Sequence, residues 1–154
     1  MDYFAAAPDA IKAVRGVEAY IQQCGLEKSL IELVKMRASQ INGCAYCLDM
    51  HSKDARRNGE TEQRLYLLNA WQESPLYSPR ERAALAWTEA LTLVAETHAP
   101  DDVYAEVRAQ FKDDELVNLT MLIGLINLWN RIAIGFRNQH PVGDHAEVPK
   151  AKRA

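Results

Sequence analysis

The sequence predicts an all-α protein that folds as a single compact domain of about six to seven helices. Apolar residues recur at three- and four-residue spacing along most of the chain, and no segment of four to eight residues alternates convincingly between apolar and polar side chains. The chain has 154 residues, which is the size of one domain with one core. Residues 1–140 are expected to form this domain, and the polar tail 141–154 is expected to be disordered.

Four helices are expected in the first half of the chain, and proline, glycine and capping residues set their bounds. Pro8 opens the first helix, because proline suits the first turn. The pair Asn42-Gly43 stops the second, since it readily adopts the left-handed conformation that ends a helix. Thr61 caps the fourth, which ends before a Ser-Pro break. The expected ranges are 8–24, 27–42, 44–57 and 61–73.

Three further helices are expected in the second half, and each has a recognisable opening. Ser78 and Glu81 form a capping box around a first-turn proline and open the fifth helix. Pro100 breaks the chain ahead of the sixth, and Asp113 or Asp114 caps the seventh. The expected ranges are 79–96, 101–111 and 113–137.

The seventh expected helix contains the most apolar stretch of the chain, residues 116–136, which is about as long as a membrane span. Three asparagines and Arg131 lie within it and are costly in hydrocarbon, so we expect no contact with a membrane. When buried, Asn127, Asn130 and Arg131 need hydrogen-bond partners, and we expect these three residues to tie helices or subunits together. A helix this apolar must be covered by the core or by another subunit, which predicts a homo-oligomer assembled through apolar helices. The asparagines are Asn118, Asn127 and Asn130.

The charge balance and the N-terminus limit the classes of function. With 18 basic and 21 acidic residues, the formal net charge is −3, and no basic excess indicates a nucleic-acid partner. The first residues lack the positive lead-in and the apolar run of a signal peptide, so a cytoplasmic location is expected. In that reducing compartment, three cysteines indicate catalysis or metal binding rather than a disulfide framework.

Residues 32–51, ELVKMRASQINGCAYCLDMH, contain the most reactive side chains. Cys44 and Cys47 open the third expected helix, and His51 follows one turn after Cys47, so these three groups form one stripe. The helix N-terminus would act most strongly on the pKa of Cys44, whereas His51 is better placed to activate Cys47. If the Gly43 turn pairs the two helices, the Glu32 carboxylate could orient His51 and share a proton with it.

The cysteine pair has three other interpretations. The thiols could be small buried hydrophobes, but such a pair would not be expected to have a histidine in register. Structural zinc usually takes ligands from two separated pairs, and the sequence has no second pair. Haem attachment needs a histidine directly after the second cysteine, where Leu48 stands. We therefore expect no metal and no cofactor. Cys24 is expected to be a buried structural thiol.

The run SLIELVKMRASQINGCAYCLDMHSKDARRNGE resembles the core motif of the alkylhydroperoxidase D-like proteins, within the carboxymuconolactone decarboxylase superfamily. That motif is Glu, eleven residues, Cys, two residues, Cys, three residues and His. It falls here on Glu32, Cys44, Cys47 and His51, with no insertion or deletion. The later runs ERAALAWTEALTL and LINLWNRIAIGF resemble single-domain members of the same group.

The resemblance implies a peroxidase-type oxidoreductase that forms trimers or hexamers and reduces hydrogen peroxide or organic hydroperoxides. It implies that Cys47 attacks the peroxide, that Cys44 resolves the product as a disulfide, and that a dithiol or protein reductant regenerates the pair. His51 and Glu32 would be the proton relay. Tyr46 departs from the best-known peroxidase of the family, which has a histidine there, and a tyrosine is a poor proton acceptor near neutral pH.

Two other functions are compatible with the same residues. One is a lactone decarboxylase or a related carbon-acid enzyme, which would not depend on the cysteine pair. The other is a non-catalytic redox sensor whose assembly changes when the disulfide forms.

Overall fold

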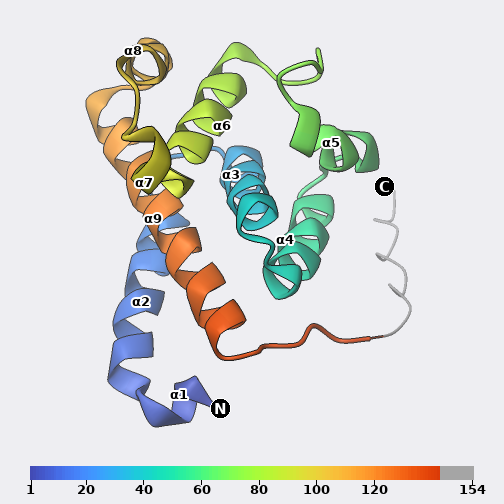
Figure 1. Cartoon of the computed structure of the whole chain (residues 1–154), viewed down its shortest axis with the longest axis vertical. Coiled ribbons are helices and arrows are strands. Elements are labelled where there is room, and N and C mark those ends of the chain that lie inside the picture. The colour runs from blue at the N-terminus through green and yellow to red at the C-terminus, as the bar shows by residue number, and fades with distance from the viewer. Residues whose placement is uncertain (143–154) are drawn as a thin grey trace, which may run out of the picture.

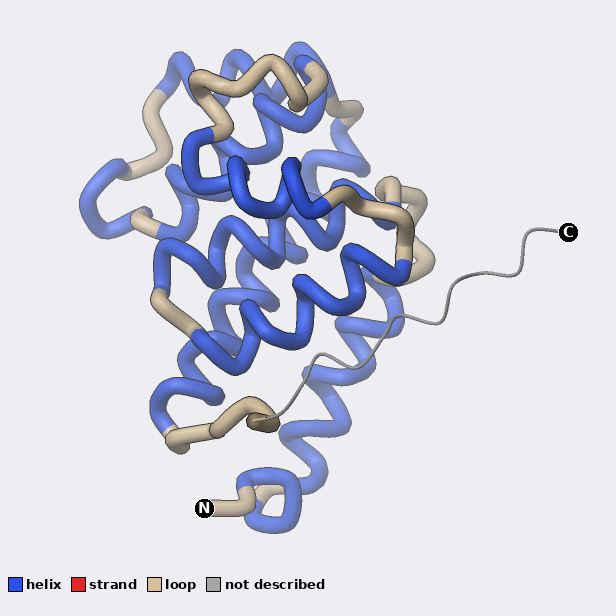
Figure 2. The backbone as a smooth tube through the Cα atoms, turned by 90° about the vertical axis from the view of Figure 1, so that its right-hand side faces the viewer, coloured by secondary structure: helices blue, strands red, loops and turns tan. Residues whose placement is uncertain are grey.

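The computed structural model describes residues 1–142, and this part of the chain is all-α, as predicted (Figure 1). Within residues 1–142 there are nine α-helices, one short 3-10 helix and no strand, and Figure 2 shows the helices joined by loops. The predicted disordered tail lies, from residue 143 onward, outside the described residues. The elements are α1 (Tyr3–Ala6), α2 (Pro8–Ile21), α3 (Lys28–Asn42), α4 (Ala45–Arg57), α5 (Glu62–Leu67), η1 (Leu68–Ala70), α6 (Pro79–Thr92), α7 (Val94–Thr97), α8 (Asp101–Gln110) and α9 (Asp113–Gly135).

The predicted end of the second helix and the predicted capping box are both confirmed. Gly43 follows α3 with φ of 67°, the left-handed conformation that ends a helix and that glycine adopts without steric cost. At the start of α6, the Ser78 hydroxyl accepts a hydrogen bond from the Glu81 N–H, and the Glu81 carboxylate accepts one from the Ser78 N–H. The local signals in the sequence therefore set these two boundaries.

Four regions differ from the predicted helices. The range 79–96 divides at Leu93 into α6 and α7, because Leu93 (φ −103°, ψ 32°) leaves the helical conformation. The range 61–73 shortens to α5 and η1, and the first helix ends at Ile21 instead of Cys24. Helix α1 was not predicted, because four residues are too few to show a helical period.

Helix α9 is the central helix of the domain and packs against α2, α3, α6 and α8 (Figure 1). It is the one helix within residues 1–142 that is long and apolar enough to cross a membrane by length and composition, and 44% of its apolar window is buried inside the domain. Its N-cap is Lys112, whose N–H donates to the Glu115 carboxylate, so Asp113 and Asp114 lie inside the first turn and are not the caps. The largest buried cluster combines α9 residues such as Leu119, Leu122 and Ile123 with residues of α3 and α6.

Helices α3 and α4 form an antiparallel pair on one side of α9, joined at Gly43 (Figure 1). A second buried cluster, which includes Leu33, Leu68 and Leu85, packs α3 against η1 and α6. Because packed neighbours fix both helices, side chains on their facing surfaces are held in a defined geometry.

Candidate active site

The two cysteines of the motif lie at the start of α4 and are joined as a disulfide, with their Cα atoms 5.4 Å apart. Cys44 is the N-cap residue, and its sulfur accepts a hydrogen bond from the Cys47 N–H at 3.4 Å. Both side chains are buried, at 1% and 2% exposure, and they pack against Ala133 of α9. The sequence placed the thiols at a helix start, and the structure locates the first of them one residue ahead of the helix.

Buried amides of α9 hold the turn that precedes the cysteines. The side-chain amide of Asn42 donates to the side-chain Oδ1 atoms of Asn127 at 3.0 Å and of Asn130 at 2.9 Å. Asn130 in turn donates to the Ser39 hydroxyl at 3.0 Å. The predicted role of these asparagines in tying helices together is thus confirmed, and the ties fix the position of the α3–α4 turn.

The other two residues of the motif meet across the α3–α4 pair. His51 Nδ1 and Glu32 Oε2 lie 3.0 Å apart, and the two residues are only 4% and 6% exposed. An ionised carboxylate can only accept, so the hydrogen in this bond is on Nδ1, and in the neutral imidazole Nε2 then has the lone pair. The expected approach of Glu32 to His51 is therefore observed.

A buried lysine adds a positive charge beside the Glu32–His51 contact. Lys35 is 4% exposed, and its Nζ lies 3.7 Å from Glu32 Oε1 and 3.6 Å from Glu18 Oε1. One ammonium thus faces two carboxylates, one of which also faces the imidazole. This arrangement keeps the buried Glu32 charge paired on both of its oxygen atoms.

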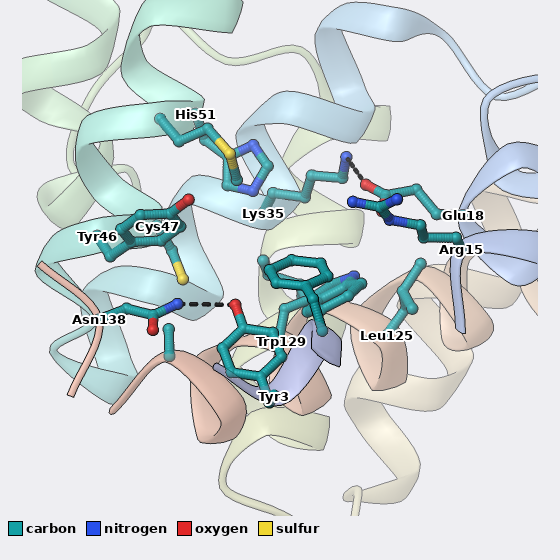
Figure 3. Close-up of a pocket in the computed structure, with 14 residues that line it drawn as sticks. Tyr3, Arg15, Glu18, Lys35, Tyr46, Cys47, His51, Leu125, Trp129 and Asn138 are labelled. Carbon is teal, nitrogen blue, oxygen red and sulfur yellow. Dashed lines mark hydrogen bonds and ion pairs between the residues drawn. The ribbon is translucent and has the colours of Figure 1, made fainter. Parts of the chain in front are cut away.

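A cavity of about 220 Å³ opens beside Cys47 and His51 (Figure 3). Figure 3 shows Cys47 and Arg15 on opposite sides of this pocket, with Tyr3 and Trp129 between them in this view. Cys44 does not line it and borders a separate hollow next to Arg137. Of the two thiols, Cys47 is therefore the one that a molecule in the pocket would meet. The lining residues are Tyr3, Phe4, Arg15, Glu18, Lys35, Tyr46, Cys47, Met50, His51, Leu125, Ile126, Trp129, Ala133 and Asn138.

The aromatic wall of the pocket comes from segments far apart in the sequence. The Asn138 amide donates to the Tyr3 hydroxyl at 2.8 Å, and the Tyr3 ring stacks on Phe136 at 5.6 Å between centroids. These contacts place α1 over the pocket. Sequence reasoning missed these residues, and no local signal in the chain indicates them.

One group of possible metal ligands occurs among the described residues, formed by Glu32, His51 and Asp54, whose ligand atoms lie within 4.8 Å of one another. Its carboxylates already face cations, because Lys35 lies beside Glu32 and Arg57 donates to Asp54 at 3.0 Å. The cysteines are not part of this group. The ion pairs account for its geometry.

The third cysteine lies away from the motif. Cys24 is a free thiol that packs at the edge of the main core and is partly exposed, so the expectation of full burial is wrong. It follows the C-terminal end of α2, where the chain turns at Gly25. It packs against a different buried cluster from the α4 pair, which makes it a useful control position.

Residues 5–90 match the carboxymuconolactone decarboxylase family. The chain is 44% identical over 139 residues to the uncharacterized protein YdfG of Bacillus subtilis, covering 90% of this chain and 95% of that one. It is also 53% identical to a structure of a protein of unknown function from Agrobacterium tumefaciens, a candidate antioxidant-defence protein AhpD. The TM-score is 0.90, and the match covers 93% of this chain and 98% of that one.

The same fold occurs at lower sequence identity. An uncharacterized peroxidase-related protein from Silicibacter sp. TM1040 has a TM-score of 0.80 with 21% identity, over 94% of this chain and 76% of that one. At this identity the likeness concerns the fold alone. The helical arrangement built around α9 is therefore shared by proteins with quite different sequences.

Proposed function

The chain belongs to the carboxymuconolactone decarboxylase family, and from this premise we propose that it is a thiol-dependent peroxidase of the alkylhydroperoxidase type. The observation that carries the proposal is the position of Cys47. Its side chain lines the pocket, it can pair with Cys44 as a disulfide, and His51 follows one turn later on the same helix. No other thiol among the described residues combines these three properties.

In the proposed reaction, His51 accepts the Cys47 thiol proton at Nε2, and the thiolate attacks one oxygen of the hydroperoxide. A sulfur–oxygen bond forms while the oxygen–oxygen bond breaks. The leaving alkoxide, or hydroxide from hydrogen peroxide, takes the proton back from His51. Cys47 is oxidised to a sulfenic acid, and the substrate is reduced to an alcohol or to water.

The cycle is completed by Cys44. Its sulfur attacks the Cys47 sulfur, the sulfur–oxygen bond breaks, and the leaving hydroxide takes the proton given up by the Cys44 thiol, so that water leaves as the disulfide forms. A dithiol reductant then exchanges with the disulfide, becomes oxidised itself and returns both cysteines to thiols. A short loop between the cysteines suits this exchange, because the crosslink constrains little of the chain. A reducing compartment such as the cytoplasm would supply the dithiol.

Glu32 is proposed to hold His51 in the tautomer that the first step needs. Its carboxylate accepts from Nδ1, which leaves Nε2 free for the thiol proton. Tyr46 lines the same pocket but has no role as a base, since its hydroxyl is a poor proton acceptor near neutral pH. The relay proposed for this chain therefore consists of His51 and Glu32.

The test is peroxide consumption with dithiothreitol as reductant and cumene hydroperoxide as substrate. Cys47→Ser should lose activity by more than about 100-fold, because no nucleophile remains at the pocket. Cys44→Ser should still react once and leave a sulfenic acid at Cys47 that dimedone traps for mass spectrometry. Cys24→Ser is the matched control and should behave as the wild type.

Three results would contradict the proposal in different ways. Unchanged turnover in Cys47→Ser would exclude the attack by this thiol. A lactone or carbon-acid activity that survives the double replacement of Cys44 and Cys47 would favour the decarboxylase function instead. Formation of the disulfide with peroxide, but without turnover in the presence of dithiol, would favour a redox sensor.

A further inference from the structure

The pocket wall contains a buried hydrogen-bond donor without a partner. Within residues 1–142, two buried side-chain nitrogen atoms lack a hydrogen-bond acceptor, Trp129 Nε1 and Arg56 Nε. Trp129 lines the pocket beside Cys47, whereas Arg56 borders a different hollow near Glu62. A buried donor without an acceptor costs folding free energy. A ligand that brings an acceptor to this N–H would therefore gain more binding free energy than it would at a donor that is already hydrogen-bonded.

Two cations lie in the same pocket as this donor. The nearest carboxylates to Lys35 Nζ, those of Glu18 and Glu32, are at 3.6 and 3.7 Å, beyond the roughly 2.7–3.2 Å of N–H···O hydrogen bonds. The Arg15 guanidinium lies 5.0 Å above the Phe4 ring at the same pocket. In Figure 3 the Lys35 and Arg15 side chains lie above the Trp129 indole.

The two cations and the two nearby carboxylates balance in formal charge, so what a ligand meets depends on which charge is free of an ion pair. The Glu18 carboxylate lines the pocket and faces Lys35. Glu32 is shared between Lys35 and His51. Arg15 is exposed and faces an aromatic ring, so its charge remains available to a ligand.

The rest of the lining sets the size and the apolar character of the ligand. A cavity of about 150 Å³ is enough to hold benzene, and this one has about 220 Å³. The additional space corresponds to a few substituent atoms on a single ring. Tyr3, Phe4 and Leu125 supply aromatic and aliphatic surface against which such a ring can pack.

We propose that the pocket binds a single-ring aromatic carboxylate, with the ring against Tyr3 and Phe4 and the carboxylate directed to Trp129 Nε1 and Arg15. The substrate is then an arylalkyl hydroperoxide with a carboxylate, whose hydroperoxy group reaches Cys47 on the opposite side. The hydroperoxide part rests on the proposed peroxidase function. Recognition of the ring and the carboxylate does not depend on that function, and it can be measured without any turnover.

The test uses two unreactive probes of the same shape, 4-isopropylbenzoate and the neutral 4-isopropylbenzamide. Their binding to the oxidised protein is measured by isothermal titration calorimetry. The wild type should bind the carboxylate about tenfold more tightly than the amide, because charge-assisted hydrogen bonds are roughly twice as strong as neutral ones. Arg15→Gln should remove most of this preference, and Trp129→Phe should weaken carboxylate binding about three- to tenfold.

Matched substitutions separate the pocket from general effects on the fold. Trp87→Phe removes an indole whose Nε1 donates to Thr120 at 3.0 Å outside the pocket, and Arg108→Gln removes an arginine of α8. Both should leave the two affinities unchanged, and circular dichroism should show all four variants to be helical. If neither probe binds, if both bind equally to the wild type, or if the preference persists in both pocket variants, the inference is wrong.

The same proteins distinguish this inference from the proposed function. Selective carboxylate binding without peroxide consumption would refute the peroxidase and retain the ligand class. Peroxide consumption without selective binding would refute the ligand class alone.

Discussion

His51 Nδ1 and Glu32 Oε2 lie 3.0 Å apart across the α3–α4 pair, and this contact joins two residues that are 19 positions apart in the chain. Since the carboxylate fixes the tautomer, Glu32→Gln should lower kcat/KM for peroxide about 10- to 100-fold, and His51→Asn about 100-fold or more. Stopped-flow oxidation of the reduced protein at several pH values measures both effects. Glu73→Gln, at an exposed position between η1 and α6, is the control. A rate in Glu32→Gln equal to that of the wild type would exclude the relay.

The contacts of Tyr3 predict that one hydrogen bond and one ring stack hold α1 against the C-terminal end of α9. Tyr3→Phe keeps the stack on Phe136 and removes the hydrogen bond, a loss of about 1 kcal/mol. Amide exchange in residues 3–6 should therefore accelerate severalfold when followed by mass spectrometry. Tyr20→Phe removes a different hydrogen bond, to Asn118 at 3.0 Å, and should leave exchange in α1 unchanged. Equal exchange of α1 in Tyr3→Phe and the wild type would contradict this role.

The α3–α4 pair and its four chemical groups could be predicted from the sequence because their geometry is local. A left-handed glycine ends one helix, and one helical turn separates Cys47 from His51. The pocket could not be predicted in the same way. Trp129 and Tyr3 line the same pocket only after α9 and α1 have packed. The sequence around either residue does not indicate that the other will lie nearby. For the same reason, nothing in the sequence indicates that the Trp129 indole N–H lacks a partner.

The exposed face of α9 predicts self-association. Val117, Met121 and Leu128 are 62%, 48% and 40% exposed, and their spacing places them on one stripe of the helix. The expected assembly is a trimer or hexamer, as the family resemblance implies. Met121→Lys should shift the protein from this oligomer toward the monomer. Size-exclusion chromatography coupled to light scattering measures the change. Gln63→Lys, on an exposed position of α5, is the control for added charge. A monomeric wild type, or an unchanged oligomer in Met121→Lys, would show that this stripe is not an interface.

The capping box of α6 predicts how stability depends on pH. Burial raises the pKa of the Glu81 carboxyl, but hydrogen bonds from Arg64 and from the Ser78 N–H outweigh it, so the pKa lies below its ordinary value. A carboxyl with a lowered pKa in the folded state stabilises the fold above its unfolded pKa of about 4.3. That contribution is lost as the pH falls through the folded pKa.

Glu81→Gln should accordingly lower the free energy of unfolding at pH 7 by about 1 kcal/mol, because glutamine can still accept from the Ser78 N–H but cannot form the ion pair with Arg64. The difference from the wild type should shrink as urea unfolding is repeated at pH values from 5 down to 3. Glu106→Gln, an exposed glutamate of α8, gives the baseline for a neutralised surface carboxylate. A difference that stays constant over this range would exclude the ionised Glu81 as its source.

The bond between Tyr3 and Asn138, which joins residues 135 positions apart, has a consequence for synthesis of the chain. Cys44 and Cys47 leave the ribosome long before Asn138 and most of α9 have been made. During that interval the nascent chain presents two thiols without the helix that buries them and without the aromatic wall of the pocket. An oxidant in solution can therefore reach both thiols at that stage, whereas in the folded domain their side chains are 1% and 2% exposed.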